Sequence, residues 1–232
     1  ADNELKLEDN KILAQNFVFS KENESVKIAN DLIQSSQNNI GIGFENFKLA
    51  NLLALFNKDD LLATGNMQGN IVAIDPFENF GLNIDFGISD LTALQAPLGE
   101  LSLKAKSESG DNYNLDLGIK GDDIDIEVKG DYALQNKGSE LDFLVNLNKI
   151  GIKTIALISG ETLDEASGNI SGEIALKGDI SNPDYKGNIQ FNDAEFNVTQ
   201  LNSKFRLAND KIKVDNSDIT FNQFSIEDGQ SN

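Results

Sequence analysis

The residues that could do chemistry in this chain are mainly carboxylates, because the chain has no His and no Cys. The densest group is Asp122-Asp123-Ile124-Asp125-Ile126-Glu127. On a strand, Asp123, Asp125 and Glu127 project from one face at intervals of ~6.6 Å. The run lacks the glycine and the spacing of an EF-hand loop. We therefore interpret it as a solvated strand face, and we expect neither a metal site nor a cofactor.

Catalytic motifs are also missing. Without His or Cys the chain can form no Ser-His-Asp triad, thiol nucleophile or zinc finger. Gly41-Ile42-Gly43 lacks the third glycine and the strand–helix context of a dinucleotide fingerprint. No G-x-S-x-G or S-x-x-K motif occurs, and no pair of carboxylates lies in an evident pocket motif. We expect a protein that is not an enzyme, with a carbohydrate-active enzyme as the least favoured alternative.

The composition limits the partners. The 232 residues include 38 acidic and 19 basic side chains, which give a net charge of −19. Binding of nucleic acid needs clustered Lys and Arg, so we expect no nucleic-acid partner. The 14 Phe residues argue against a disordered acidic tail. No run approaches the ~20 apolar residues of a membrane span, and the first ten residues show no secretion signal. We interpret the chain as a piece of a longer polypeptide.

Alternating apolar and polar residues dominate the chain and predict about fifteen strands, each buried on one face. Clusters of Gly, Asn and Asp separate these runs, which favours hairpins in a meander. The fold class is therefore all-β, with a long and mostly antiparallel sheet. The apolar positions that we predict to share one face, and to line any groove, are Leu82, Ile84, Phe86, Leu101, Leu103, Leu115, Leu117, Ile119, Ile124, Ile126, Val128, Leu141, Phe143, Val145, Leu147, Ile170, Ile174, Leu176, Ile189 and Phe191.

Three short stretches show helical spacing, at 47–56, 89–95 and 149–159. Each is too short to stand alone, so we expect such helices to plug an end of the sheet. A weak repeat accompanies them, because residues 65–71 resemble residues 168–174 at an offset of 103. Ile84 and Ile189 match after a further drift of two residues. Repeated units of this kind imply a stackable architecture.

The apolar face of such a sheet needs cover, and the chain has no long amphipathic helix to provide it. A sandwich, a closed barrel and a sheet folded lengthwise into an open trough all remain possible. Glycines within or beside strands permit bending and bulges. A slip in the alternation at residues 221–224 has the form of a bulge.

Residues 166–229 carry a more specific pattern. A Gly-rich strand ends in Asn182-Pro183, and a G-x-I-x-F-x-D-A segment follows at 187–194. An N-D-x-I motif occupies 209–212, and F-x-I-x-D-G closes the stretch at 224–229. As a set these motifs resemble the C-terminal region of the TamB family, the translocation and assembly module subunit of the Gram-negative cell envelope. Upstream residues agree in style and carry no diagnostic motif.

The resemblance implies a single elongated β domain over residues 1–232, folded into an open hydrophobic trough with two or three short helices. It implies a periplasm-facing segment of a non-enzymatic protein anchored in the inner membrane. The trough would conduct phospholipid acyl chains and support outer-membrane protein assembly with an Omp85-type partner. Contact with a membrane would involve only parts absent from this chain. From the residues alone, a structural adhesin or stalk with a closed core is the alternative.

Overall fold

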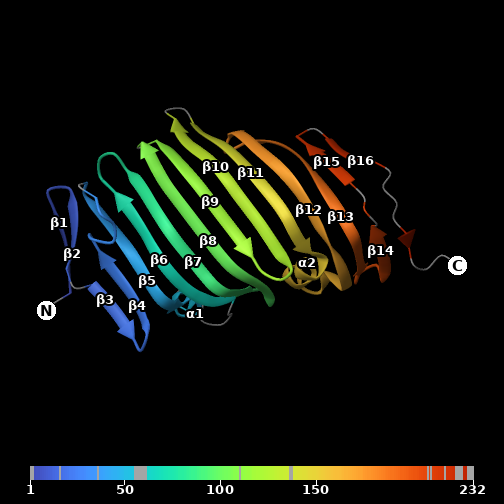
Figure 1. Cartoon of the computed structure of the whole chain (residues 1–232), viewed down its shortest axis with the longest axis horizontal. Coiled ribbons are helices and arrows are strands. Elements are labelled where there is room, and N and C mark those ends of the chain that lie inside the picture. The colour runs from blue at the N-terminus through green and yellow to red at the C-terminus, as the bar shows by residue number, and fades with distance from the viewer. Residues whose placement is uncertain are drawn as a thin grey trace.

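The structure, a computed structural model, describes residues 3–15, 17–35, 37–54, 62–109, 111–135, 138–207, 209, 211–216, 218–222 and 227–228. Most of the described residues form antiparallel strands that lie side by side in one long sheet (Figure 1). The first strands are β1 (Glu4–Glu8), β2 (Lys11–Gln15), β3 (Phe17–Lys21), β4 (Glu24–Ala29), β5 (Asn39–Lys48) and β6 (Ala63–Ile74). The central strands are β7 (Gly81–Ala93), β8 (Ala96–Ser109), β9 (Asn112–Lys120), β10 (Ile124–Gln135), β11 (Gly138–Gly151), β12 (Leu163–Asp179) and β13 (Asp184–Val198). The last are β14 (Ser203–Leu207), β15 (Lys211–Asp215), β16 (Asp218–Asn222) and β17 (Glu227–Asp228).

The sheet is open. Its strands follow the order β16-β15-β13-β12-β11-β10-β9-β8-β7-β6-β5-β4-β3. Off this path, β14 pairs with β13, and β17 pairs with β14. β3 and β16 stand at opposite ends and do not pair with each other in the described part of the chain. The predicted all-β class, the meander and the open antiparallel sheet are confirmed. Neither a sandwich nor a closed barrel describes this arrangement.

A separate hairpin of β1 and β2 lies at the N-terminal end of the sheet (Figure 1). The side chain of Asn30 holds it there. Its amide oxygen accepts the N–H of Ala14 at 2.8 Å, and its Nδ2 donates to the carbonyls of Ile12 and Asn39 at 2.7 and 2.5 Å. One amide thereby satisfies backbone groups of both sheets, which fixes the hairpin against β5.

Two short α-helices lie along one rim of the sheet, where α1 (Leu49–Leu53) follows β5 and α2 (Ile152–Ile158) follows β11 (Figure 1). A 3-10 turn, η1 (Gly160–Thr162), connects α2 to β12. The helices predicted within 47–56 and 149–159 are confirmed, although residues 55 and 56 lie outside the described residues. None of the described helices is long and apolar enough to cross a membrane.

The helix predicted at 89–95 is wrong, because β7 continues to Ala93. The pairing of β7 with β8 shifts between Ile88 and Leu91, and Asp90 adopts a φ of +52°. This bulge changes the parity of the strand, so Ile88 and Leu91 are both buried in the same cluster. Apolar residues three positions apart therefore imitate a helical spacing. The slip predicted at 221–224 extends beyond the described residues.

The internal repeat is visible in the pairing of the strands. β5, α1, β6 and β7 correspond to β11, α2, β12 and β13 at a constant offset of 103, and each helix begins at the equivalent residue. Phe47 pairs with Met67 as Ile150 pairs with Ile170. Gly69 pairs with Phe86 as Gly172 pairs with Ile189. The predicted drift of two residues is therefore wrong, since Phe86 and not Ile84 corresponds to Ile189.

Equivalent glycines, Gly69 and Gly172, sit where the backbone of the next strand leaves no room for a Cβ. A Cβ on Gly69 would lie 2.1 Å from the carbonyl oxygen of Asp85, and one on Gly172 would lie 2.2 Å from that of Asn188. Gly69 also has a φ of +111°, which disfavours any other residue. The same local constraint is therefore met by the same residue in both copies.

We predict that Gly172→Ala destabilises the fold by about 1–3 kcal/mol, because the added methyl forces two backbones apart. Gly69→Ala, at the equivalent place, should cost at least as much. The control is Gly87→Ala, where the nearest atom to a Cβ lies at 3.2 Å. Urea unfolding measures all three changes. A stability of Gly172→Ala equal to that of the control would contradict the close approach.

Candidate functional site

The pairing register places every predicted groove residue on one face of the sheet, because residues that oppose each other in antiparallel strands share a face. On β8 and β9, for example, Leu103 opposes Leu117. On β10 and β11, Val128 opposes Val145 and Ile126 opposes Leu147. We call this surface the apolar face.

One row of the apolar face runs without a polar residue from strand β3 to strand β15. Each member opposes the next across the sheet, over a distance on the order of 50 Å at ~4.8 Å per strand. The row is Phe19, Val26, Phe44, Gly69, Phe86, Leu103, Leu117, Val128, Val145, Ile174, Gly187 and Val214.

Two further rows flank it. Nearer the helices runs a row from Met67 to Ile212 that includes Ile88, Leu101 and Leu147. On the other side runs a row from Phe17 to Tyr185. The apolar face thus continues over β3 to β6 and onto β15, beyond the residues predicted from sequence. Alternation within β5 and β6 was the signal that could have extended the prediction.

The apolar face is only partly covered. Of the predicted groove residues, Ile124 and Leu141 are buried, at 5% and 8% exposure, and the others are half-buried. No second sheet lies over them in the described part of the chain. A contiguous apolar surface of this extent marks an interaction site rather than a closed core.

Cover is concentrated at the rim that carries α1 and α2, which we call the helix rim. Leu49 and Leu52 of α1 pack against a buried cluster that includes Met67, Ile88 and Leu98. Around α2 a second cluster is formed by Ile152, Ala194 and Leu207, with Ile155, Ile170 and Phe191 against it. The helices therefore close one end of the apolar face, as predicted for short helices that plug a sheet.

A buried carboxylate anchors α1. Glu24, 7% exposed, lies at the start of β4 and accepts hydrogen bonds from Lys48 Nζ at 2.9 Å and Asn51 Nδ2 at 3.0 Å. The hydrogen bond from Lys48 holds the pKa of Glu24 below its ordinary value, and Glu24 raises the pKa of Lys48. Shortly before α2, Lys149 Nζ pairs with Asp123 at 3.0 Å, although the offset of 103 places Gly151 and not Lys149 at the position of Lys48. In both cases a lysine shortly before the helix is paired with an acid at the start of the neighbouring strand or directly before it.

The acidic run at 122–127 has the structural role expected of a solvated face. Asp125 accepts a hydrogen bond from Asn148 Nδ2 at 3.0 Å, and Glu127 pairs with Lys129 at 3.3 Å. Among the described residues, no group of three or more His, Cys, Asp or Glu side chains could hold a metal ion. Across the outer face, Lys129 also lies 3.8 Å from Asp116, and Lys177 lies 2.8 Å from Asp142. The outer face therefore carries charged side chains of both signs, which interact with water.

The rim opposite the helices carries aromatic residues with hydroxyl groups, and we call it the tyrosine rim. Tyr113 and Tyr132 oppose each other with ring centroids 6.1 Å apart, and Tyr185 lies near the start of β13. The Tyr113 hydroxyl donates to the carbonyl of Phe80 at 3.2 Å. Burial, with the nearby charge of Asp111, raises the pKa of Tyr113, so its hydroxyl stays neutral at physiological pH. These three tyrosines lie far apart in the sequence and were not predicted as a group.

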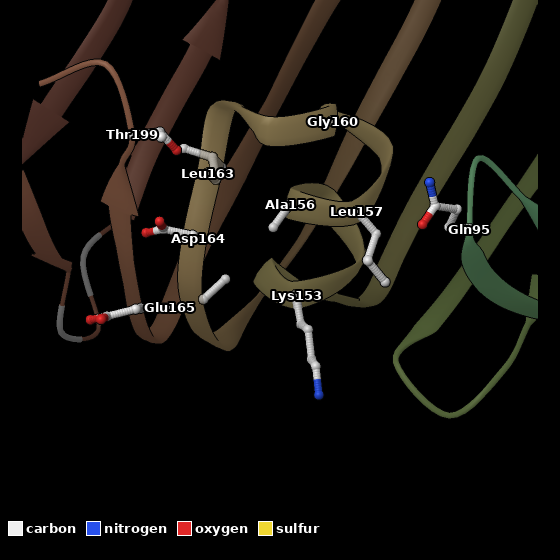
Figure 2. Close-up of a pocket in the computed structure, with 10 residues that line it drawn as sticks. Gln95, Lys153, Ala156, Leu157, Gly160, Leu163, Asp164, Glu165 and Thr199 are labelled. Carbon is white, nitrogen blue, oxygen red and sulfur yellow. The ribbon is translucent and has the colours of Figure 1, made fainter. Parts of the chain in front are cut away.

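An open pocket of about 740 Å³ lies beside α2, between β12 and the β7–β8 turn (Figure 2). Its lining includes Ala156, Leu157 and Leu163, while Lys153 extends away from the helix (Figure 2). Its carboxylates already have partners, since Asp164 accepts from Asn197 at 2.6 Å and Glu165 pairs with Lys204 at 3.4 Å. The pocket is therefore a hollow at the helix rim whose two carboxylates are each paired with a neighbouring side chain.

Comparisons with protein-family models, with curated proteins and with solved structures find no match to this chain.

We predict that Glu24→Gln removes a pH-dependent part of the stability, because it removes the charge and keeps the size. In the unaltered chain, the stability that comes from the lowered pKa of Glu24 is complete above the ordinary glutamate pKa. It is lost as the pH falls through the folded-state pKa. At the alkaline end, the contribution of Lys48 is lost as the pH rises through its raised pKa.

Urea unfolding between pH 3 and pH 7 tests this, with Asp142→Asn as the control at an exposed ion pair of little energetic weight. The difference in stability between the unaltered chain and Glu24→Gln should shrink on acidification. A difference independent of pH would contradict the anchor.

Proposed function

We propose that this chain is a non-enzymatic segment that binds phospholipid by its acyl chains on the apolar face and conducts them along the sheet. The observation that carries the proposal is the apolar row that runs unbroken from β3 to β15, with Phe19 of β3 exposed and the other members half-buried. Acyl chains match this surface because they need continuous contact with hydrocarbon and no specific polar group. A protein with this role needs no catalytic residue.

The energetics favour such an occupant. Each methylene withdrawn from water contributes ~0.8 kcal/mol. Along the central row an acyl chain keeps the same apolar contacts at each strand, so movement by one strand replaces one set of contacts with an equivalent set. Desolvation at a polar interruption would create a barrier to that movement, and the row contains no polar side chain.

The resemblance of residues 166–229 to the TamB family supports the same proposal and extends it. On that basis the chain belongs to the periplasmic part of an envelope protein in a Gram-negative bacterium, anchored in the inner membrane by another part. It would pass phospholipid toward the outer membrane and support outer-membrane protein assembly with an Omp85-type partner. The negative outer face would keep the segment soluble in that compartment.

We predict that the purified chain carries phospholipid and that Ile126→Asp with Phe143→Asp removes most of it, by at least fivefold. Both side chains lie on the apolar face, where a carboxylate would have to be desolvated against an acyl chain. The control adds the same charge to the outer face through Ser102→Asp with Asn188→Asp. Lipid extraction with phosphate assay measures the lipid per protein, and circular dichroism measures the strand content.

Unchanged lipid content in the apolar-face variant, with the fold retained, would contradict the proposal. A chain that carries no acyl ligand, even when incubated with phospholipid vesicles, would favour the alternative of a structural stalk or adhesin.

A further inference from the structure

All three tyrosines of the chain lie on the apolar face at the tyrosine rim, and the chain has no Trp. Tyr132 opposes Leu141, and Tyr185 opposes Leu176, so the side chains share the face of the groove residues. Tyr185 is 39% exposed, and Tyr113 and Tyr132 are half-buried. Aromatic rings with a hydroxyl group are therefore gathered at one end of the apolar face only.

At the opposite end of the face, buried apolar clusters pack beneath the two helices. On β9, Tyr113 stands six residues from Ile119, which packs against the buried cluster beneath α1. Tyr185 stands the same distance along β13 from Phe191, which packs near α2. Six residues of strand span about 20 Å. On these two strands the face therefore changes over that height from tyrosine at one rim to Ile119 and Phe191 in the buried clusters at the other.

This height and polarity correspond to half of a lipid bilayer. With its headgroup regions a bilayer is about 40–45 Å thick, so one leaflet measures about 20–22 Å. Tyrosine is enriched at the boundary between hydrocarbon and headgroups, because its ring is apolar and its hydroxyl needs a polar partner. A lipid with its headgroup at the tyrosine rim would have tyrosine beside its headgroup and apolar side chains beside its acyl chains. This is the order of polarity found in one leaflet of a bilayer.

We infer that phospholipid binds in one orientation, with its headgroup at the tyrosine rim and its chain ends toward α1 and α2. This inference rests on the proposed function and adds to it the side of the sheet from which headgroups project. The helices at the helix rim act as stops for the chain ends, since buried clusters fill the face beneath them. The tyrosine rim has no described helix along it, so it leaves the headgroup in water (Figure 1).

The composition supplies a direct test, because the intrinsic fluorescence of the chain comes from the tyrosine rim alone. Bromine atoms quench fluorescence at short range. The chain would be loaded with phosphatidylcholine brominated either next to the headgroup or near the terminal methyl, since a neutral headgroup avoids repulsion by the acidic protein. We expect the bromines next to the headgroup to quench at least twice as strongly as those near the methyl.

A matched variant moves the probe to the other end of the face. Tyr113→Phe, Tyr132→Phe and Tyr185→Phe remove the rim tyrosines, and Leu147→Tyr places one in the row nearer the helices, where the side chain is half-buried. In this variant the depth preference should reverse. Because these positions lie on the apolar face, quenching is compared per bound lipid, with the bound lipid measured by extraction and the fold by circular dichroism.

The outcomes separate the two claims. Equal quenching at both depths, or stronger quenching by bromines near the methyl in the unaltered chain, would overturn the orientation and leave lipid binding intact. The absence of quenching by either lipid, together with the absence of bound lipid by extraction, would overturn the proposed function itself.

Discussion

The constraint on which this molecule depends is the register between neighbouring strands. Side chains alternate with a period of two along a strand, so a slip of one residue would move its apolar side chains to the charged face. Within the central part of the sheet the register holds across β5 to β13, and the apolar rows exist only because it does. The open face and its length both follow from this single property.

Irregularity is confined mostly to the helix rim. The register shifts between Phe44 and Phe47 and, at the offset of the repeat, between Leu147 and Ile150. Other shifts lie at the same rim, and one between Ser107 and Ser109 lies at the tyrosine rim. Bulges bend a strand and redirect its side chains. At the helix rim, bulges allow both odd- and even-numbered positions of one strand to pack into the buried clusters. In the middle of the sheet the side chains keep a strict alternation between the two faces.

Much of this could be predicted from sequence because it depends on local periodicity. Alternation identified which residues share a face, and the polar spacing of Asp123, Asp125 and Glu127 identified the opposite one. Prediction failed where the outcome depends on a distant strand. The bulge at Asp90 arises from pairing with β8, and it made residues 89–95 resemble a helix. The tyrosines are scattered in sequence, and only the topology brings Tyr113, Tyr132 and Tyr185 to one rim.

The absence of polar side chains from the central row is not explained by stability alone. A half-buried position on an open sheet tolerates Thr or Ser at a modest energetic cost, since its polar group can reach water. A long exposed apolar surface, by contrast, promotes aggregation. Twelve successive strands nevertheless present only apolar residues or glycine in this row. A surface that carries this liability along its whole length fits the proposed role, in which acyl chains move across the sheet from one strand to the next.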